Sequence, residues 1–344
     1  MLIGVEMNQY YVGLDLGTKW IYATMIDEEK CVIRDAKIPC TEVAIDGFFA
    51  GMPKECLNVV MEACGIWHGL YDYLVQRCKV VKVANSLQTK LNLSGKKTDK
   101  LDSMRLADLL RMNGIAESYV PSKGARDYRS KVRHRQSMVN ISVDLKNMIH
   151  AVLRRENITK PVGFQDIFTK KGIAWLRGLG ISEIDGCLEL ITAANMQTKN
   201  AELAIPADVY KNEIKLLKTM PGVGDITAPV IMSEIVDIKR FDNPKALCKL
   251  ADLVPKVIQS GDSDRRGRLV KQSSKILRTA LIQSAQGVLK KKDGGKLKAF
   301  FIRMAKRKKF NAAVAALAHK MLYIMWFMLT NNEEFHDGEI QVDG

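Results

Sequence analysis

Four acidic residues occupy positions from which they could act on one substrate. Asp15 lies at the end of a predicted strand, and Glu62 directly follows a compact apolar run. Asp99 and Asp102 open a predicted helix, where a spacing of three residues places both carboxylates on one helix face. Converging carboxylates repel one another unless hard divalent cations neutralise them, and paired cations stabilise both the attacking and the leaving oxygen of phosphoryl transfer. The four acids therefore predict a metal-binding phosphoryl-transfer site.

Each acid also has a structural interpretation. Asp99 follows Thr98 and can serve as a favourable charge at a helix N-terminus. Glu62 can cap the helix that follows it, and Asp15 can belong to a turn. The catalytic interpretation depends on the four acids occurring together in one ordered set of strands.

A second candidate centre is Ser260, which precedes Gly261 and a dense cationic run. A serine hydroxyl is a weak nucleophile without activation, but nearby Arg and Lys side chains can hold a scissile phosphate and offset its negative charge. A Ser-Gly pair by itself is more often a simple turn, and the cationic run by itself can serve for phosphate binding alone, so the catalytic interpretation depends on the two occurring together. The predicted phosphate-binding residues are Arg265, Arg266, Arg268, Lys271, Lys275 and Arg278.

The first part of the chain has the element order of an α/β domain with a mixed sheet. Three β-rich segments separated by short polar turns predict a meander, and short apolar runs further on predict strands buried on both faces. The predicted strands are Tyr11–Leu16, Ile21–Ile26, Cys31–Ile38, Leu57–Met61 and Lys79–Ala84. The predicted helices are Thr41–Ala50, Gly65–Arg77 and Lys100–Met112, the last after a basic loop at Asn85–Lys97.

After Pro121 the pattern becomes helical. Apolar residues recur at spacings of 3, 4, 3 and 4, which is the pattern of a coiled-coil seam. The stretch covers only about two to three heptads, so a helix packed within its own domain is an equally good interpretation. The seam residues are Met138, Ile141, Leu145, Met148 and Val152.

From Pro206 onward a second helical region begins. The segment Met220-Pro-Gly-Val-Gly-Asp225, followed by the apolar run Ile226–Ile235, resembles the hairpin of a helix-hairpin-helix module. Its glycines, Gly222 and Gly224, would let backbone N–H groups approach a nucleic-acid phosphate. A plain turn between helices is the alternative. The predicted divisions are residues 9–120, 121–205 and 206–330, with a polar, acidic and frayed tail at 331–344.

The charge distribution favours a polyanionic partner. The chain of 344 residues carries 53 Lys and Arg against 38 Asp and Glu, a net charge of +15. Sixteen of these basic residues fall between Arg265 and Phe310, with one acid, Asp293. Such clustering favours nucleic acid over a merely solvated surface.

The cysteines and the apolar segments indicate a cytoplasmic protein. Seven Cys is an odd number, and no pair has the C-x-x-C spacing, so we expect reduced thiols without a disulfide framework or a zinc site. No secretory signal is visible at the N-terminus. The apolar segment Ala312–Leu329 contains His319 and Lys320, so a buried helix is favoured over a membrane span.

Taken together, these motifs resemble the DEDD insertion-sequence transposases, a family that includes Piv-type DNA invertases and is also described as bridge-RNA-guided recombinases. The resemblance covers roughly residues 9–330, and its specificity lies in the order and spacing of the motifs rather than in any one of them. The motifs are Tyr11-Val-Gly-Leu-Asp15, Met61-Glu62, Thr98-Asp99-x-x-Asp102 with Ala107, Met220-Pro-Gly-Val-Gly224, Arg240-Phe241, Leu253-Val-Pro255, Ser260-Gly261, Lys271 and Leu277-Arg278.

The resemblance implies a fold and a mechanism. The fold is an α/β domain like RNase H and RuvC, a helical connector resembling a coiled coil, and a mainly α transposase domain. Asp15, Glu62, Asp99 and Asp102 would bind Mg²⁺, and Ser260 would attack a DNA phosphate to form a covalent phosphoserine link. The partners would be donor and target double-stranded DNA, a structured noncoding guide RNA, and further copies of the chain, as a homodimer that assembles into a tetramer on DNA. No membrane partner is implied.

The sequence departs from the family pattern near the serine. Asp252 and Ser273 stand where members usually have Gly, and Ser273 and Ser274 become rival nucleophiles. Three other interpretations stay open: an actin-like or sugar-kinase-type ATPase, suggested by Val12-Gly-Leu-Asp15-Leu-Gly-Thr18, a metal-dependent nuclease or junction resolvase without a covalent intermediate, and a non-catalytic nucleic-acid-binding protein.

Overall fold

The computed structural model describes residues 8–85, 98–251, 253, 255–260, 263–269 and 274–337, and for 255–260 and 263–269 it describes the backbone alone. The chain divides into two compact units, Met1–Val120 and Pro121–Gly344. Each unit has its own core, and each is treated by itself below.

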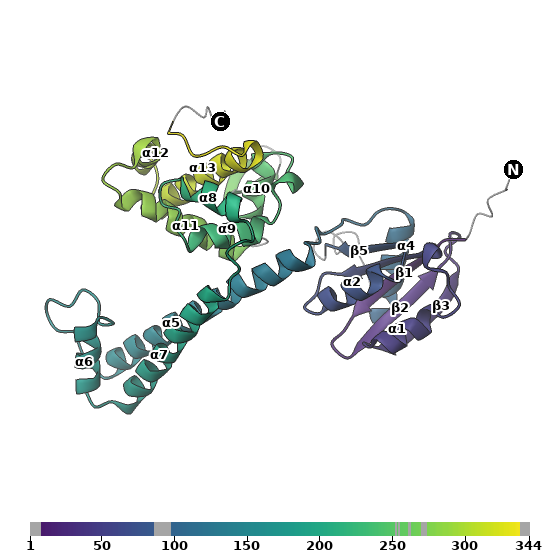
Figure 1. The fold of residues 1–344 in the computed structure, drawn as a ribbon, viewed down its shortest axis with the longest axis horizontal. Coiled ribbons are helices and arrows are strands. Elements are labelled where there is room, and N and C mark those ends of the chain that lie inside the picture. The colour runs from purple at the N-terminus through teal and green to yellow at the C-terminus, as the bar shows by residue number, and fades with distance from the viewer. Residues whose placement is uncertain are drawn as a thin grey trace. The chain divides into compact units, whose positions relative to one another are not determined.

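The N-terminal unit is built on a five-stranded mixed sheet (Figure 1). Its strands are β1 (Tyr10–Leu16), β2 (Trp20–Ile26), β3 (Val32–Pro39), β4 (Leu57–Glu62) and β5 (Val80–Ala84), in the order β3-β2-β1-β4-β5. The pairs β1–β2 and β2–β3 are antiparallel, whereas β1–β4 and β4–β5 are parallel. The predicted meander and the predicted mixed α/β order are confirmed.

Helices cover both faces of this sheet. Helices α1 (Glu42–Phe49) and α2 (Trp67–Val75) contribute to a core that contains alternate residues of the strands, such as Val12, Leu14 and Met61. Helix α4 (Asp99–Arg111) lies over the opposite face, where Leu106 and Leu110 pack against Val60 of β4. A short 3-10 turn at Lys54–Cys56 leads into β4.

Helix α4 approaches β1 unusually closely, because the residue at the crossing is glycine. A Cβ added at Gly13 would lie 1.9 Å from the backbone oxygen of Ser103 and 2.7 Å from the backbone nitrogen of Ala107. Beside this crossing, the hydroxyls of Thr24 in β2 and Ser103 form a buried hydrogen bond of 2.7 Å. The contact fixes where the first turn of α4, with its two acids, lies on the sheet.

The C-terminal unit begins with the long helix α5 (Lys123–Arg155), followed by α6 (Lys170–Gly178) and α7 (Ser182–Leu203). Helices α5 and α7 lie side by side (Figure 1), and α5 buries Leu145, Ile149 and Val152 in the core that they share. Packing within the domain, one of the two interpretations of the apolar pattern, therefore accounts for this helix pair. The residues of the predicted seam are not all part of it, because Ile141 and Met148 are 44% and 55% exposed.

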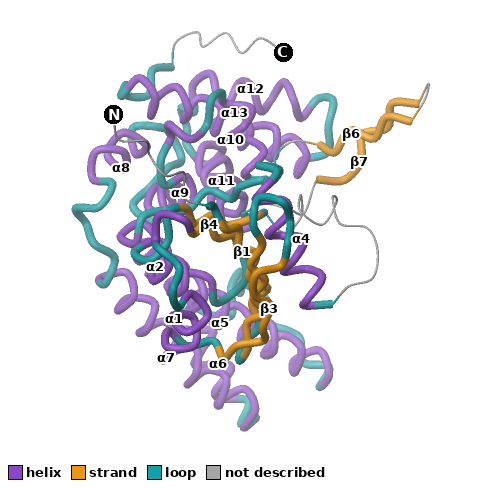
Figure 2. The backbone as a smooth tube through the Cα atoms, turned by 90° about the vertical axis from the view of Figure 1, so that its right-hand side faces the viewer, coloured by secondary structure: helices purple, strands orange, loops and turns teal. Residues whose placement is uncertain are grey.

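The rest of the C-terminal unit is a helical bundle with one strand pair. Its helices are α8 (Lys211–Lys218), α9 (Thr227–Ile235), α10 (Pro244–Leu250), α11 (Lys275–Lys290), α12 (Gly295–Ala305) and α13 (Phe310–Asn331), with a 3-10 turn at Ile238–Arg240. The apolar helix α13 is long enough to cross a membrane, but about half of it is buried in the bundle, including Leu317, Met321 and Met325. Strands β6 (Pro255–Ser260) and β7 (Ser263–Leu269) form an antiparallel pair that extends from the helices (Figure 2). The sequence pattern did not predict this pair.

The first residues of the acidic tail are held in place, unlike the frayed end predicted from composition. Phe335 packs on the bundle core, and its backbone N–H donates to the hydroxyl of Thr219 at 2.9 Å. The carboxylate of Asp337 accepts a hydrogen bond of 3.0 Å from the backbone N–H of Lys296 in the first turn of α12. A carboxylate there satisfies an otherwise unpaired N–H and complements the helix dipole, which composition alone does not reveal.

All seven cysteines are free, as expected. Cys56, Cys78, Cys187 and Cys248 are buried, and burial raises the pKa of the Cys78 and Cys248 thiols to about 12. These thiols are inert core residues, since the thiolate is the reactive form.

Gly222 and Gly224, which were both predicted to bind phosphate, differ in their surroundings. Gly222 has a φ of +86°, and an added Cβ would lie 2.1 Å from the backbone oxygen of Ser284 in α11, whereas a Cβ at Gly224 would meet no atom within 4 Å. We expect Gly222→Ala to lower the melting temperature, at a cost of about 3 kcal/mol, because a backbone atom cannot move aside as a side chain can. Gly224→Ala should leave the melting temperature unchanged. Equal melting temperatures for the two variants would contradict this packing, and only Gly224→Ala tests phosphate binding without disturbing the fold.

Candidate active site

Two of the predicted acids lie at one edge of the N-terminal sheet. Asp15 is the penultimate residue of β1, and Glu62 is the last residue of β4. The parallel register pairs Leu14 with Met61, so the next residue of each strand is the acid. Because side chains alternate along a strand, both acids lie on the face that carries Gly13 and Val60, which is the face covered by α4.

The other two acids lie in the first turn of α4. Thr98 caps this helix, since its side chain accepts a hydrogen bond of 3.3 Å from the backbone N–H of Leu101. Asp99 and Asp102 then occupy the helix end whose dipole favours negative charge. Asp102 also accepts a 3.5 Å hydrogen bond from Arg105, which offsets part of its charge.

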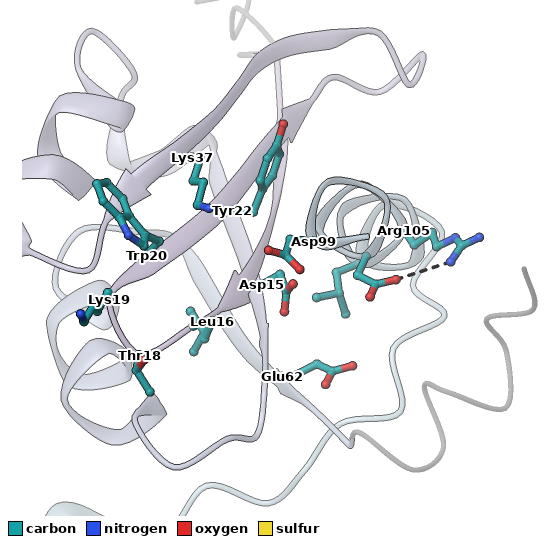
Figure 3. Close-up of a pocket in the computed structure, with 13 residues that line it drawn as sticks. Asp15, Leu16, Thr18, Lys19, Trp20, Tyr22, Lys37, Glu62, Asp99 and Arg105 are labelled. Atoms are coloured by element: carbon teal, nitrogen blue, oxygen red, sulfur yellow. Dashed lines mark hydrogen bonds and ion pairs between the residues drawn. The ribbon is translucent and has the colours of Figure 1, made fainter. Parts of the chain in front are cut away.

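All four acids line one cavity of about 620 Å³. In Figure 3, Asp15 and Asp99 lie beside each other at the centre, Glu62 lies at the end of its strand, and Arg105 lies on the opposite side of the helix. The structure thus brings the four residues together around a common space. Within the described part of the chain, no three acidic, histidine or cysteine side chains come close enough to share one metal ion as they are placed.

The chemical nature of the donors fits a hard divalent cation. Four carboxylates supply the oxygen ligands that Mg²⁺ and Ca²⁺ accept, and an unscreened group of four negative charges is electrostatically unfavourable. The acids are only half-buried or exposed, so water can complete a coordination shell. The donor chemistry of the cavity is therefore suited to a cation held by one or two carboxylates and by water.

Several residues of this cavity were not predicted from the sequence. They are Leu16, Gly17, Thr18, Lys19, Trp20, Tyr22, Lys37, Arg105 and Leu106. Arg105 could have been found by its spacing of three from Asp102. Trp20, Tyr22 and Lys37 could not, because their place depends on the register between β2 and β3, which pairs Tyr22 with Lys37.

An ion pair connects the first turn of α4 to the edge strand β3. Lys100, in the first turn of α4, contacts the carboxylate of Asp35 in β3, and this contact raises the pKa of the Lys100 amine. Burial raises the pKa of the neighbouring Tyr22 hydroxyl, and Asp35 adds to the shift. The Tyr22 hydroxyl is thus tied to the same acid that Lys100 contacts, so the ring of Tyr22 is held in place at the cavity wall.

The predicted serine centre lies in the C-terminal unit. The backbone places Ser260 at the end of β6, opposite Ser263 of β7, and places Arg265, Arg266 and Arg268 along β7. Gly261 and Lys271 lie outside the described residues. Lys275 and Arg278 lie in the first turn of α11.

The rival serines are only partly described. The Ser274 side chain caps α11 by accepting a hydrogen bond of 3.1 Å from the backbone N–H of Leu277. Ser274 thus has a structural role, and Ser273 and Asp252 lie outside the described residues.

Comparison with known families places both halves of the chain in one group. Residues 12–158 match the DEDD transposase family of IS110, and residues 214–301 match the family described as "Transposase IS116/IS110/IS902 family". The chain belongs to the IS110 family of DEDD insertion-sequence transposases. The first match contains all four acids of the cavity, and the second contains Ser260.

Full-length relatives agree with this assignment. The chain is 23% identical over 339 residues to the transposase for insertion sequence element IS1111A of Coxiella burnetii, covering 95% of this chain and 91% of the relative. It is 24% identical over 361 residues to a probable family 20 transposase of Pseudomonas aeruginosa, covering 96% and 100%. This transposase is therefore a DNA recombination enzyme, and the interpretation as an actin-like ATPase is set aside.

Proposed function

We propose that this transposase recombines DNA by metal-assisted phosphoryl transfer at the carboxylate cavity. The observation that carries the proposal is the presence of Asp15, Glu62, Asp99 and Asp102 around one cavity, within the segment that matches the DEDD family. The N-terminal unit is proposed to have an RNase H/RuvC-like fold. In support, one acid lies on β1, one ends β4, and two lie on the following helix α4.

The proposed cofactor is Mg²⁺. Transposase domains of the DEDD type generally depend on divalent metal ions, and the four carboxylates are the ligands we assign to it. When bound, the metal supplies Lewis-acid stabilisation of the charge that develops on the phosphate oxygens. Arg105 holds the carboxylate of Asp102 in place by a hydrogen bond. Lys19 and Lys37 bring positive charge to the cavity, where they would attract the phosphate.

The proposed nucleophile is Ser260. Its hydroxyl oxygen would attack the phosphorus of one DNA strand, the strand oxygen would leave, and a phosphoserine link would hold the broken end until rejoining. The position of Ser260 at the end of β6, within the segment of residues 214–301 that matches the second family region, supports this role. The positive side chains of Lys275 and Arg278 at the start of α11 are proposed to hold phosphates, together with the arginines of β7 and Lys271.

The proposed partners are donor DNA, target DNA and a structured noncoding RNA encoded by the same element. The excess of 53 basic over 38 acidic residues supports binding to nucleic-acid backbones of either kind. We also propose a cytoplasmic homodimer that assembles into a tetramer on DNA, so that the carboxylate cavity of one copy acts with the serine of another.

The test is a search for a covalent adduct. The protein is expressed beside its native flanking DNA, so that any element-encoded RNA is present, supplied with Mg²⁺ and quenched with denaturant. We expect a protein–DNA adduct in the wild type, and no adduct in Ser260→Ala, although the variant still binds DNA. Cleaved DNA without an adduct, lost only in Asp15→Ala, would instead identify a hydrolytic nuclease and rule out the serine mechanism.

A further inference from the structure

The four acids occupy only one part of their cavity. A second part of its wall comes from β2, β3 and the turn before β2, through Thr18, Lys19, Trp20, Tyr22 and Lys37. Figure 3 shows Trp20, Tyr22 and Lys37 on one side of the cavity, with Asp15 and Asp99 between them and Arg105. A cavity that served only to hold a metal ion would not need this second wall.

The sheet register explains why this wall faces the acids. Tyr22 pairs with Asp15 on one side and with Lys37 on the other, so the three side chains form one row on the face that α4 covers. Trp20 lies two residues before Tyr22 and therefore projects from the same face. Helix α4 crosses the sheet at Gly13 and Thr24. Its first turn reaches the Tyr22 row through Lys100, whereas the ring of Trp20 stays exposed.

Trp20 is the unusual member of this wall. Its side chain is 48% exposed although it borders a cavity, and Trp is one of the residues with most apolar area to bury. The Lys37 ammonium lies 5.9 Å from the centre of its ring, within the range of a cation–π contact. An exposed indole beside a cation is the combination with which proteins bind single-stranded nucleic acid, through base stacking and phosphate attraction.

We propose that Trp20 and Lys37 form a subsite for one unpaired nucleobase and its neighbouring phosphate, next to the phosphate held at the carboxylates. A paired base is already stacked on its neighbours, so the indole can receive a base only where the duplex is locally opened. The subsite makes Trp20 a positioning residue that holds the opened strand. This inference rests on the proposed function, because it takes DNA as the substrate of the carboxylate cavity.

The experiment compares two ligands of equal charge. One is a 12-nucleotide strand of deoxyadenosine, and the other is an abasic strand of the same length. The full-length protein should bind the first about tenfold more tightly, since stacking on an aromatic side chain has that order of effect. Trp20→Ala should bring the ratio of the two dissociation constants close to one, and Trp20→Phe should keep most of the preference, because the phenyl ring still stacks.

Tryptophan fluorescence locates the effect on the chain. The deoxyadenosine strand should quench part of the emission of the wild type, and Trp20→Phe should remove that part. The matched control is Trp67→Phe, which lies in the same unit but packs its ring against Tyr71 and His68 in α2, and it should keep the base-dependent quenching. Thermal unfolding of each variant checks that the N-terminal unit stays folded.

Two results would overturn the subsite. A base preference that is unchanged in Trp20→Ala would show that no base stacks there, and a change of oligomeric state in Trp20→Ala without nucleic acid would make Trp20 a protein interface. These results are separable from failure of the proposed function, which would appear as strand exchange that survives Asp15→Asn. If Asp15→Asn is inactive while Trp20→Ala still prefers the strand that carries bases, the base subsite is refuted and the proposed function stands.

Discussion

Asp15→Asn is expected to reduce strand exchange by about 10³-fold or more. Asp15 lies on the strand next to the one that ends in Glu62, and in Figure 3 it lies beside Asp99 of α4, so it is well placed to share a cation with an acid of either element. An amide keeps the shape but removes the charge that holds a divalent ion. Loss of several kcal/mol of charge stabilisation in the transition state corresponds to about three powers of ten in rate. Strand exchange on native element ends, measured by quantitative amplification of the junction, gives the ratio.

The same substitution should leave the fold intact. Removing one of four neighbouring negative charges relieves repulsion, so without metal the variant should melt at the same temperature as the wild type or above it. Added Mg²⁺ should raise the melting temperature of the wild type and have a smaller effect on the variant, because a ligand stabilises only the form that binds it. The control is Glu55→Gln, an exposed acid outside the cavity that should keep full activity. Full strand exchange by Asp15→Asn would refute the role of the carboxylate cavity.

The carboxylate cavity was predictable because its acids follow from local rules. A compact apolar run before Glu62 indicated a strand buried on both faces, and a β-rich segment placed Asp15 near a strand end. The apolar spacing after Lys100 placed Asp99 and Asp102 at the start of a helix, and α4 begins at Asp99 with Thr98 as its cap. Each of these signals lies within a few residues of the acid concerned. The parallel pairing of β1 with β4 then brings Asp15 and Glu62 to the same edge of the sheet.

The remaining wall of the cavity depends on long-range pairing that local patterns do not contain. The place of Lys37 beside Trp20 follows from the register of β2 with β3, in which one residue of slip would turn Lys37 to the other face. Nor did composition predict β7, because Ser263–Leu269 is rich in Arg and has few of the residues that favour strands. The apolar spacing on α5 predicted a helix correctly but left its packing open, since a stripe of this kind suits either a partner chain or α7.

Gly13→Ala is expected to destabilise the N-terminal unit and to reduce activity at the same time. The new Cβ would lie 1.9 Å from the backbone oxygen of Ser103, so α4 must move away from β1. Overpacking that cannot be relieved by a side-chain rotation costs about 3 kcal/mol, which lowers the melting temperature of a unit of this size by roughly 10 °C. Because α4 carries two of the four acids, the shift also moves Asp99 and Asp102 relative to Asp15. A misplacement of about 1 Å can lower a rate by about 10²-fold.

The two effects of Gly13→Ala can be separated by temperature. Strand exchange is measured well below the melting temperature of the variant, where its N-terminal unit is folded, so that a loss of rate reports displaced acids rather than unfolded protein. Gly69→Ala is the matched control, since a Cβ there meets no atom within 4 Å, and alanine at this exposed position of α2 should stabilise slightly. A Gly13→Ala variant with the wild-type melting temperature would contradict the close crossing of α4 over β1. A destabilised variant with full activity would mean that the reaction tolerates movement of α4. The positions of Asp99 and Asp102 set by the crossing at Gly13 would then not determine the rate.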